Sequence, residues 1–180
     1  QRIERRLAER EKSQAVLQYA DPLFFATRSL HFMPDPWQEG VLQWQGQKLL
    51  LNCCRQSGKS TIAAILALHR AIYFPRALVL LVSRSLRQSA ELFKKVQDQL
   101  SVLPVRKLDE DNKLSLQLTN GSRIVSLPGS EETIRGFSGV SLLIEDEASR
   151  VSDALYLATK PMLAVSQGRH ILMSTPWGKR

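Results

Sequence analysis

The stretch NCCRQSGKST, residues 52–61, combines residue types that bind phosphate groups. Gly58 permits close approach of the backbone to a ligand, Lys59 can reach the β- and γ-phosphates, and the Ser60 hydroxyl can take Mg²⁺. The general phosphate loop reads G-x-x-x-x-G-K-[ST], whereas Cys53 stands here in the place of the first glycine. The stretch therefore reads as a variant phosphate loop, and a triphosphatase would need an acid elsewhere in the chain.

That acid is supplied by LLIEDEAS, residues 142–149, where an apolar run ends in three consecutive carboxylates. Asp146 is placed to hold Mg²⁺, directly or through water, and Glu147 is placed to orient and deprotonate the attacking water. Glu145 is a competing candidate because the three acids stand together. Combined with the phosphate loop, this segment predicts a nucleotide triphosphatase.

The elements that must position these residues alternate along the chain. Continuous apolar runs, typical of strands buried on both faces, cover residues 48–54, 77–83, 140–145 and 170–175. Helices are predicted for residues 37–44, 60–74, 85–103 and 154–165. Residues 114–128 predict a hairpin with Asn120-Gly121 at its turn. Buried strands that alternate with helices predict an α/β fold, in which helices cover both faces of a mostly parallel sheet.

The N-terminal part of the chain has a different composition. Residues 1–19 are rich in Arg, Glu and Gln and predict a solvated helix, whereas residues 21–36 contain three prolines and predict irregular structure. We therefore expect an N-terminal helical extension over residues 1–30 and the phosphate-binding core over residues 31–180. Because the first residue is Gln, we expect the chain to be a piece of a longer protein.

Composition limits the classes of function. The 180 residues suffice for a domain with a hydrophobic core, and the net charge of +8 favours nucleic acid as a partner, with a solvated basic surface as the alternative. No apolar run approaches the roughly 18 residues of a membrane span, and the charged N-terminus is not a secretory signal. Two adjacent cysteines, Cys53 and Cys54, favour a reducing cytosol over a disulfide framework or a zinc site.

Three segments in this order, CRQSGKST, LLIEDEAS and LMSTPWGK, resemble the ATPase motor of the large terminase subunit of tailed bacteriophages. Members of this family carry an R-Q-x-G-K-[ST] loop, a hydrophobic run ending in D-E, and an S-T-P segment after the next strand. The resemblance spans roughly residues 33 to 180. It implies a P-loop NTPase fold of the RecA-like (ASCE) type, a DNA-translocating ATPase, and ATP and Mg²⁺ as cofactors. The missing first glycine departs from the general loop and not from this family.

The resemblance also implies roles for single residues. ATP would be bound by Cys54, Arg55, Gln56, Ser57, Gly58, Lys59, Ser60 and Thr61. Arg55 would lie near the γ-phosphate, unless it forms a salt bridge to an acid such as Glu147. Gln38 would read the adenine base, since an amide can both donate and accept. Ser174 and Thr175 would sense the loss of the γ-phosphate and transmit it.

Arg135 stands eleven residues before Asp146 and resembles an arginine finger that reaches into the ATP site of a neighbouring subunit. The alternative is a loop arginine that faces solvent or DNA. The resemblance implies double-stranded DNA, the procapsid portal and the small terminase subunit as partners. It further implies a homo-oligomeric ring when assembled, with a monomer as the alternative for the isolated chain, a place in the host cytoplasm and no membrane. We expect no nuclease activity, because no nuclease domain follows in this piece.

Two other functions remain open at this stage. D-E-A-S is similar to the D-E-x-x box of helicase-like ATPases that act on nucleic acid, although the R-Q-x-G-K loop and the short chain favour a terminase. A nucleotide-binding scaffold without turnover is the non-enzymatic alternative.

Overall fold

The computed structural model of the chain describes residues 21–105, 107–112, 114–130, 133–134 and 136–177, with the backbone alone for residues 107–112. The chain divides into two compact units, Gln1–Trp44 and Gln45–Arg180. The helix predicted for residues 1–19 lies outside the described residues. The predicted domain boundary near residue 30 stays a prediction.

The first unit contains short helices where the sequence predicted irregular structure. Helix α2, Pro22–Phe24, continues into the π-helix η1, Phe25–Ser29. The Asp21 side chain accepts a hydrogen bond of 2.9 Å from the Leu23 N–H and so caps this segment. The expectation for residues 21–36 was wrong over residues 22–29, because the proline here starts a helix instead of breaking one. Helix α3, Pro36–Leu42, also begins at a proline and confirms the predicted short helix.

The second unit is built on a sheet whose described strands follow the order β1-β7-β6-β2-β5-β4-β3. Their bounds are Lys48–Asn52 for β1, Leu78–Ser83 for β2, Lys107–Asn112 for β3, Ser115–Leu118 for β4, Arg123–Pro128 for β5, Val140–Asp146 for β6 and Arg169–Ser174 for β7. Strands β1, β7, β6, β2 and β5 pair in parallel, whereas β4 and β3 add antiparallel pairs. The predicted mostly parallel sheet is thereby confirmed.

Strand β7 lies between the strand that precedes the phosphate loop and the strand that ends in the acids. Asn52 of β1 pairs with Ser174, and Asp146 of β6 pairs with Met173. All the parallel strands therefore bring their carboxyl ends to one edge of the sheet, where ligands of open α/β sheets bind. Strand β1 ends two residues earlier than residue 54, the predicted end.

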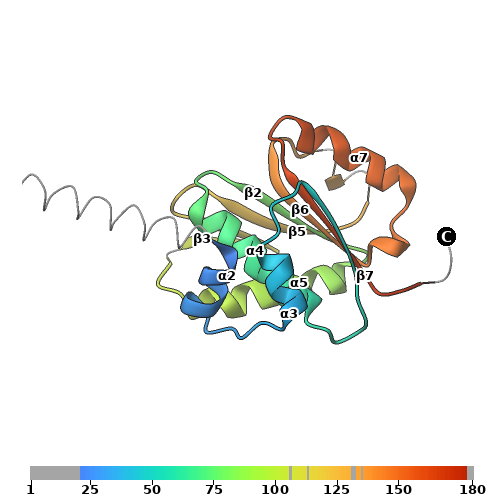
Figure 1. The fold of residues 1–180 in the computed structure, drawn as a ribbon. Helices are drawn as coiled ribbons and strands as arrows, with labels where there is room; N and C mark the ends of the chain where they lie inside the picture. Colours follow the sequence, from blue (N-terminus) through green and yellow to red (C-terminus); the bar gives the residue numbers. More distant parts are fainter. Residues whose placement is uncertain (1–20, 106, 113, 131–132, 135, 178–180) are drawn as a thin grey trace, which may run out of the picture. The chain divides into compact units, whose positions relative to one another are not determined.

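Helices cover both faces of this sheet (Figure 1). Helices α4, Lys59–Tyr73, and α5, Leu86–Ser101, pack against each other on one face, and α7, Asp153–Ala164, lies on the other. Helix α7 contains Pro161, as predicted for this segment. Within the described residues no helix has the length and apolarity needed to cross a membrane.

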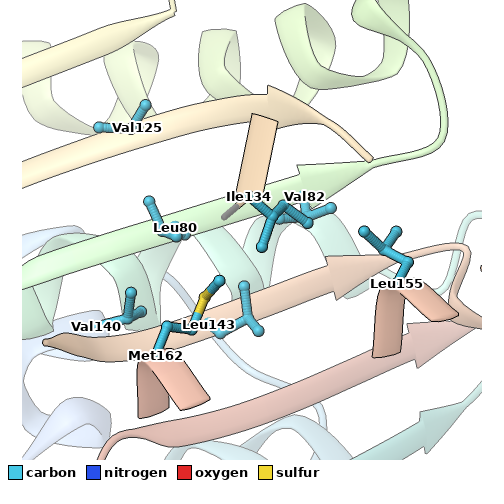
Figure 2. Packing of buried hydrophobic residues seen from close by; sticks show 8 residues of the cluster. All are labelled: Leu80, Val82, Val125, Ile134, Val140, Leu143, Leu155 and Met162. Carbon is cyan, nitrogen blue, oxygen red and sulfur yellow. The ribbon is translucent and has the colours of Figure 1, made fainter. Parts of the chain in front are cut away.

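The core under α7 explains why the parallel strands are apolar at nearly every position. Figure 2 shows eight residues of one buried cluster, namely Leu80, Val82, Val125, Ile134, Val140, Leu143, Leu155 and Met162. Leu155 and Met162 come from α7, and Leu80 and Val82 are alternate residues of β2. Because successive side chains of a strand point to opposite faces, Val79 and Leu81 are buried on the side of α4 and α5.

The predicted hairpin is formed by β4 and β5, with Gly121 in a left-handed conformation at φ 82°. Asn120 in this turn donates hydrogen bonds of 2.8 Å and 3.1 Å to the carbonyls of Ala71 and Ile72, which ties the hairpin to the end of α4. Strand β3 was missed, because its sequence KLDEDN has no alternation of apolar residues. Charged residues are common on a strand at the edge of a sheet, where they discourage pairing with other chains.

Candidate nucleotide-binding site

The phosphate loop lies between β1 and α4, as the sequence predicted. Gly58 stands immediately before α4 with φ 88°, a left-handed conformation that glycine adopts without strain. Gln56 is also left-handed, at φ 60°. The Gly58 carbonyl accepts the first helical hydrogen bonds, from the N–H groups of Thr61 at 3.0 Å and Ile62 at 3.1 Å. The loop therefore leads directly into the amino-terminal end of a long helix, which favours anions.

Lys59 reaches back across this loop. Its ammonium group donates hydrogen bonds of 3.1 Å to the Cys53 carbonyl and 2.6 Å to the Cys54 carbonyl. The side chain is buried although it carries a charge. Because an ammonium group has three N–H donors, one donor remains for a phosphate oxygen while both loop contacts persist. Lys59 thus both shapes the loop and points a charge into it.

Asp146 is the last residue of β6, and Glu147 begins a tight turn directly after it. Glu147 has φ 54° and ψ 41°, a left-handed conformation that is uncommon for a residue with a side chain. Its backbone N–H donates a hydrogen bond of 3.0 Å to Oδ1 of Asp146. Burial raises the pKa of Asp146 above its ordinary value. The hydrogen bond from the Glu147 N–H and the charge of Lys59 lower this pKa, whereas the charge of Glu147 raises it further. This turn sets the two carboxylates side by side.

Glu145, the competing candidate for the water-activating acid, lies elsewhere. It is completely buried, and its Oε1 lies 2.8 Å from Nε2 of His170 on the neighbouring strand β7. Tyr156 of α7 stacks on the His170 ring, with ring centroids 5.8 Å apart. Because β-strand side chains alternate, Glu145 points to the face of the sheet that α7 covers. The structure thus gives Glu145 a buried structural partner.

Two hydroxyl groups hold the acidic turn, one from Ser174 at the end of β7 and one from Thr175 directly after it. The Thr175 hydroxyl donates a hydrogen bond of 3.3 Å to Oε2 of Glu147. Ser174 accepts a hydrogen bond of 3.2 Å from the Ser149 N–H, and its hydroxyl donates to the Ser149 hydroxyl at 2.6 Å. The predicted coupling residues therefore contact the loop that carries Glu147. Sequence reasoning gave no role to Ser149, although it lies in the quoted acidic segment.

These elements enclose a cavity of about 430 Å³. Its lining consists of Arg55, Gln56, Ser57, Gly58, Lys59, Ser60, Thr61, Lys95, Asp146, Glu147 and Thr175. The structure thus brings together almost all of the predicted loop residues and both acids. Cys54 does not line the cavity and contributes its carbonyl to Lys59 instead. Arg55 is exposed, and within the described part of the chain it forms no ion pair with Glu147.

Lys95 of α5 is the lining residue that sequence reasoning missed. No local pattern marks it, because it is one of two consecutive lysines on a predicted amphipathic helix. Only the packing of α5 beside α4 brings it to the phosphate loop.

Two further predicted residues, Arg135 and Gln38, are considered separately from this cavity. Arg135 lies outside the described residues, so its role stays a prediction. Gln38 belongs to the first unit, where its Oε1 accepts a hydrogen bond of 2.9 Å from the Asp35 N–H at the start of α3. The adenine role of Gln38 stays a prediction.

A second cavity, of about 410 Å³, lies on the α7 side of the sheet and is lined by Leu50, Tyr156 and Trp177 among others. Its lining includes the carboxylates of Glu145 and Asp153 but neither lysine nor arginine. Phosphate groups therefore fit the first cavity, where cations and a helix terminus are present.

The donor atoms in the first cavity fit Mg²⁺. Ser60 provides a hydroxyl and Asp146 a carboxylate, both hard oxygen ligands. No cluster of three or more His, Cys, Asp or Glu residues that could hold a metal occurs among the described residues. The pair of oxygen ligands from Ser60 and Asp146 suits Mg²⁺. This ion keeps several waters and is held by one or two protein oxygens together with the phosphates of a substrate.

Comparison with known proteins agrees with this geometry. The sequence profile of a family described as "Terminase large subunit, T4likevirus-type, N-terminal" matches residues 50–180. The fold resembles the ATPase domain of the Thermus phage P74-26 large terminase, with a TM-score of 0.75 and 21% identity over 87% of this chain and 70% of that chain.

Two larger proteins show the same fold. The large terminase of bacteriophage HK97 has a TM-score of 0.72 and 19% identity, covering 87% of this chain and 37% of that chain. The large terminase of another thermophilic bacteriophage, in complex with ADP, has a TM-score of 0.62 and 11% identity, covering 88% of this chain and 37% of that chain. The RecA-like P-loop fold expected from the sequence is thereby confirmed.

Proposed function

Because the chain belongs to the large terminase subunit family, in its T4likevirus-type N-terminal part, we propose that it is the ATP-hydrolysing motor that moves double-stranded DNA into a procapsid. The observation that carries this proposal is that the Lys59 loop and Glu147 line the same cavity. A phosphate-binding loop without an acid would only bind nucleotide. Here a carboxylate held by Thr175 stands at the same cavity, as hydrolysis requires.

The residues of the cavity take distinct parts in the proposed reaction. The loop N–H groups, Lys59 and Arg55 bind the phosphates and stabilise the charge that spreads over the γ-phosphate oxygens. Glu147 orients the attacking water and accepts its proton. Ser60 and Asp146 would hold Mg²⁺, which supplies further neutralisation of phosphate charge when bound. Chemistry here is mostly positioning and electrostatics, so a preorganised loop matters more than any covalent step.

The contacts of β7 support a route from hydrolysis to movement. Thr175 touches Glu147 and Ser174 touches Ser149, so a change at the γ-phosphate reaches the end of β7 through two hydroxyls. Beyond them, the Arg150 guanidinium lies 3.7 Å from the Trp177 ring centroid. In the proposed motor, loss of the γ-phosphate alters these contacts and moves the segment after β7. This role for Ser174 and Thr175 agrees with the family resemblance.

Double-stranded DNA, the procapsid portal and the small terminase subunit are the proposed partners, and the host cytoplasm is the proposed location. The net charge of +8 supports contact with DNA. The test measures phosphate release by the chain with ATP and Mg²⁺, alone and with DNA, procapsids and small subunit. Protection of DNA from nuclease inside the procapsid then reports packaging. Separation of nucleic-acid strands without packaging would point to the helicase alternative, and binding without turnover to the scaffold.

Arg135 is proposed to act in a neighbouring subunit of an assembled ring. An arginine finger raises the rate by about 10³ to 10⁵-fold, so Arg135→Ala should bind ATP yet hydrolyse it very slowly in the assembly. Mixing Arg135→Ala with Glu147→Gln subunits should restore part of the phosphate release, because some subunits then combine an intact Glu147 with a neighbour's Arg135. If confirmed mixed rings show no recovery, Arg135 does not act in trans.

A further inference from the structure

Helix α5 is held rigidly beside the phosphate loop. Leu92, Phe93 and Val96 are buried on one side of this helix, so its backbone is anchored to the sheet. The Gln99 amide donates a hydrogen bond of 3.3 Å to the carbonyl of Thr61, in the first turn of α4. Because residues four apart share a face of a helix, Lys95 lies on the same side of α5 as Gln99. The packing therefore directs Lys95 toward the start of α4.

Lys95 lines the phosphate cavity from this side. Its side chain is exposed, and no described residue forms a hydrogen bond or an ion pair with its ammonium group. Lys59, by contrast, already donates to the carbonyls of Cys53 and Cys54. Lys95 thus presents a charge to the cavity that no described residue of the chain already binds.

The balance of charge in the cavity depends on Lys95. The lining holds three cations, Arg55, Lys59 and Lys95, against the two carboxylates of Asp146 and Glu147. Without Lys95, the formal charges of the lining would cancel. A nucleotide with several negative charges therefore gains a net attraction from this residue, in addition to the loop N–H groups and the helix terminus.

We propose that Lys95 is a further nucleotide-binding residue, which contacts the phosphate chain of the bound nucleotide from α5. The inference rests on the proposed function and adds a residue to the same site. Lys95 lines the same cavity as Thr61, which lies in the first turn of α4, so we assign its contact to phosphates that ADP and ATP share. Such a contact is equally strong before and during reaction, so it affects KM and leaves kcat unchanged.

Three variants test the assignment. Lys95→Ala should weaken ADP and ATP binding alike, by about tenfold, as expected for the loss of one charge-assisted hydrogen bond. Lys95→Arg should restore most of the affinity. The matched control is Lys94→Ala, because Lys94 is the adjacent exposed lysine of α5 and does not line the cavity. This control should bind ADP like the unchanged protein.

Isothermal titration with ADP, at low and high salt, and steady-state kinetics with ATP give the measurements. The difference between Lys95→Ala and the unchanged protein should shrink as salt increases. Lys95→Ala that binds ADP normally, or no more weakly than Lys94→Ala, would overturn the assignment. If turnover is lost in Lys59→Ala but binding is normal in Lys95→Ala, only the Lys95 assignment fails. Normal turnover in Lys59→Ala would instead remove the proposed function on which it rests.

Discussion

The phosphate loop and the acidic turn lie at the same edge of the sheet, but they are stabilised in different ways. Both contain a residue other than glycine in the left-handed region, Gln56 in the loop and Glu147 in the turn. In the loop, Lys59 binds carbonyls only five and six residues away. In the turn, Glu147 is bound by a hydroxyl 28 residues away. The side-chain contacts that shape the loop are therefore local, although the Cys53 N–H also donates a hydrogen bond of 3.1 Å to the Ser174 carbonyl, whereas the side chain of Glu147 is held from a distant segment.

Because of this difference, we expect two kinds of variant. Some remove a charged or catalytic group, and others change the position of Glu147. A change in the loop should remove a charge and leave the rest of the site in place. A change in β7 should leave every catalytic group present and alter only where Glu147 points.

Lys59→Ala should reduce phosphate release by at least about 10³-fold, because a preorganised positive charge on the phosphates is lost. The fold should remain intact, since the contacts of the ammonium group are confined to its own loop. Phosphate release and the thermal unfolding midpoint are the two measurements. A folded Lys59→Ala protein with normal turnover would show that this loop is not a catalytic phosphate loop.

Glu147→Gln should keep ATP binding and lose about 10² to 10⁴-fold in turnover, because an amide cannot accept the proton of water. Glu145→Gln is the matched control in the same strand. It should retain turnover but lower the free energy of unfolding by about 1 to 3 kcal/mol, because the buried contact with His170 is weakened. The reverse result, with turnover lost only in Glu145→Gln, would mean that the catalytic acid has been assigned to the wrong residue.

Thr175→Val tests whether β7 positions the acidic turn. Valine is close to threonine in shape but has no hydroxyl, so Glu147 loses one hydrogen bond and keeps its charge. We expect about a tenfold fall in kcat, as for loss of one hydrogen bond to a charged group, with little change in ADP affinity. Unchanged kcat would show that the acidic turn keeps its position without the Thr175 hydroxyl.

Asp146→Asn should change the free energy of unfolding, and the size of this change should depend on pH. Burial raises the pKa of Asp146, so the folded state holds this proton more tightly than the unfolded chain. The resulting stability is present below the unfolded pKa and is lost as pH rises through the folded pKa. Asparagine does not titrate, so the variant should unfold at a higher temperature than the unchanged protein near neutral pH. Denaturation scans from acidic to neutral pH measure whether this advantage grows with pH.

The same variant should bind nucleotide more weakly in the presence of Mg²⁺, because a carboxylate ligand is replaced by an amide. A variant that is more stable and binds Mg²⁺-nucleotide less well would identify Asp146 as a residue kept for function at a cost in stability. Equal Mg²⁺ dependence in both proteins would remove Asp146 from the metal site.

Most of the sheet and its helices could be predicted, because buried parallel strands are continuous apolar runs and the helices have clear periodicity. Strand β3 and the helices of residues 22–29 could not be predicted from the sequence, for different reasons. Strand β3 is highly charged and exists only because β4 offers it a pairing edge. The helix at Pro22 depends on a cap from Asp21, and the proline itself was taken as a breaker.

The phosphate loop could be identified from the chain's residues alone, since G-K-S between a buried strand and a helix acts through backbone groups and neighbours in the chain. The sequence also located three acids at the end of a strand and favoured Glu147 over Glu145 as the acid that activates water. Only the tertiary structure decided that Glu145 pairs with His170 while Glu147 meets Thr175. It alone brought Lys95 to the cavity. The physical reason is that backbone-based sites need only local order, whereas the direction and partners of a side chain depend on elements distant in sequence.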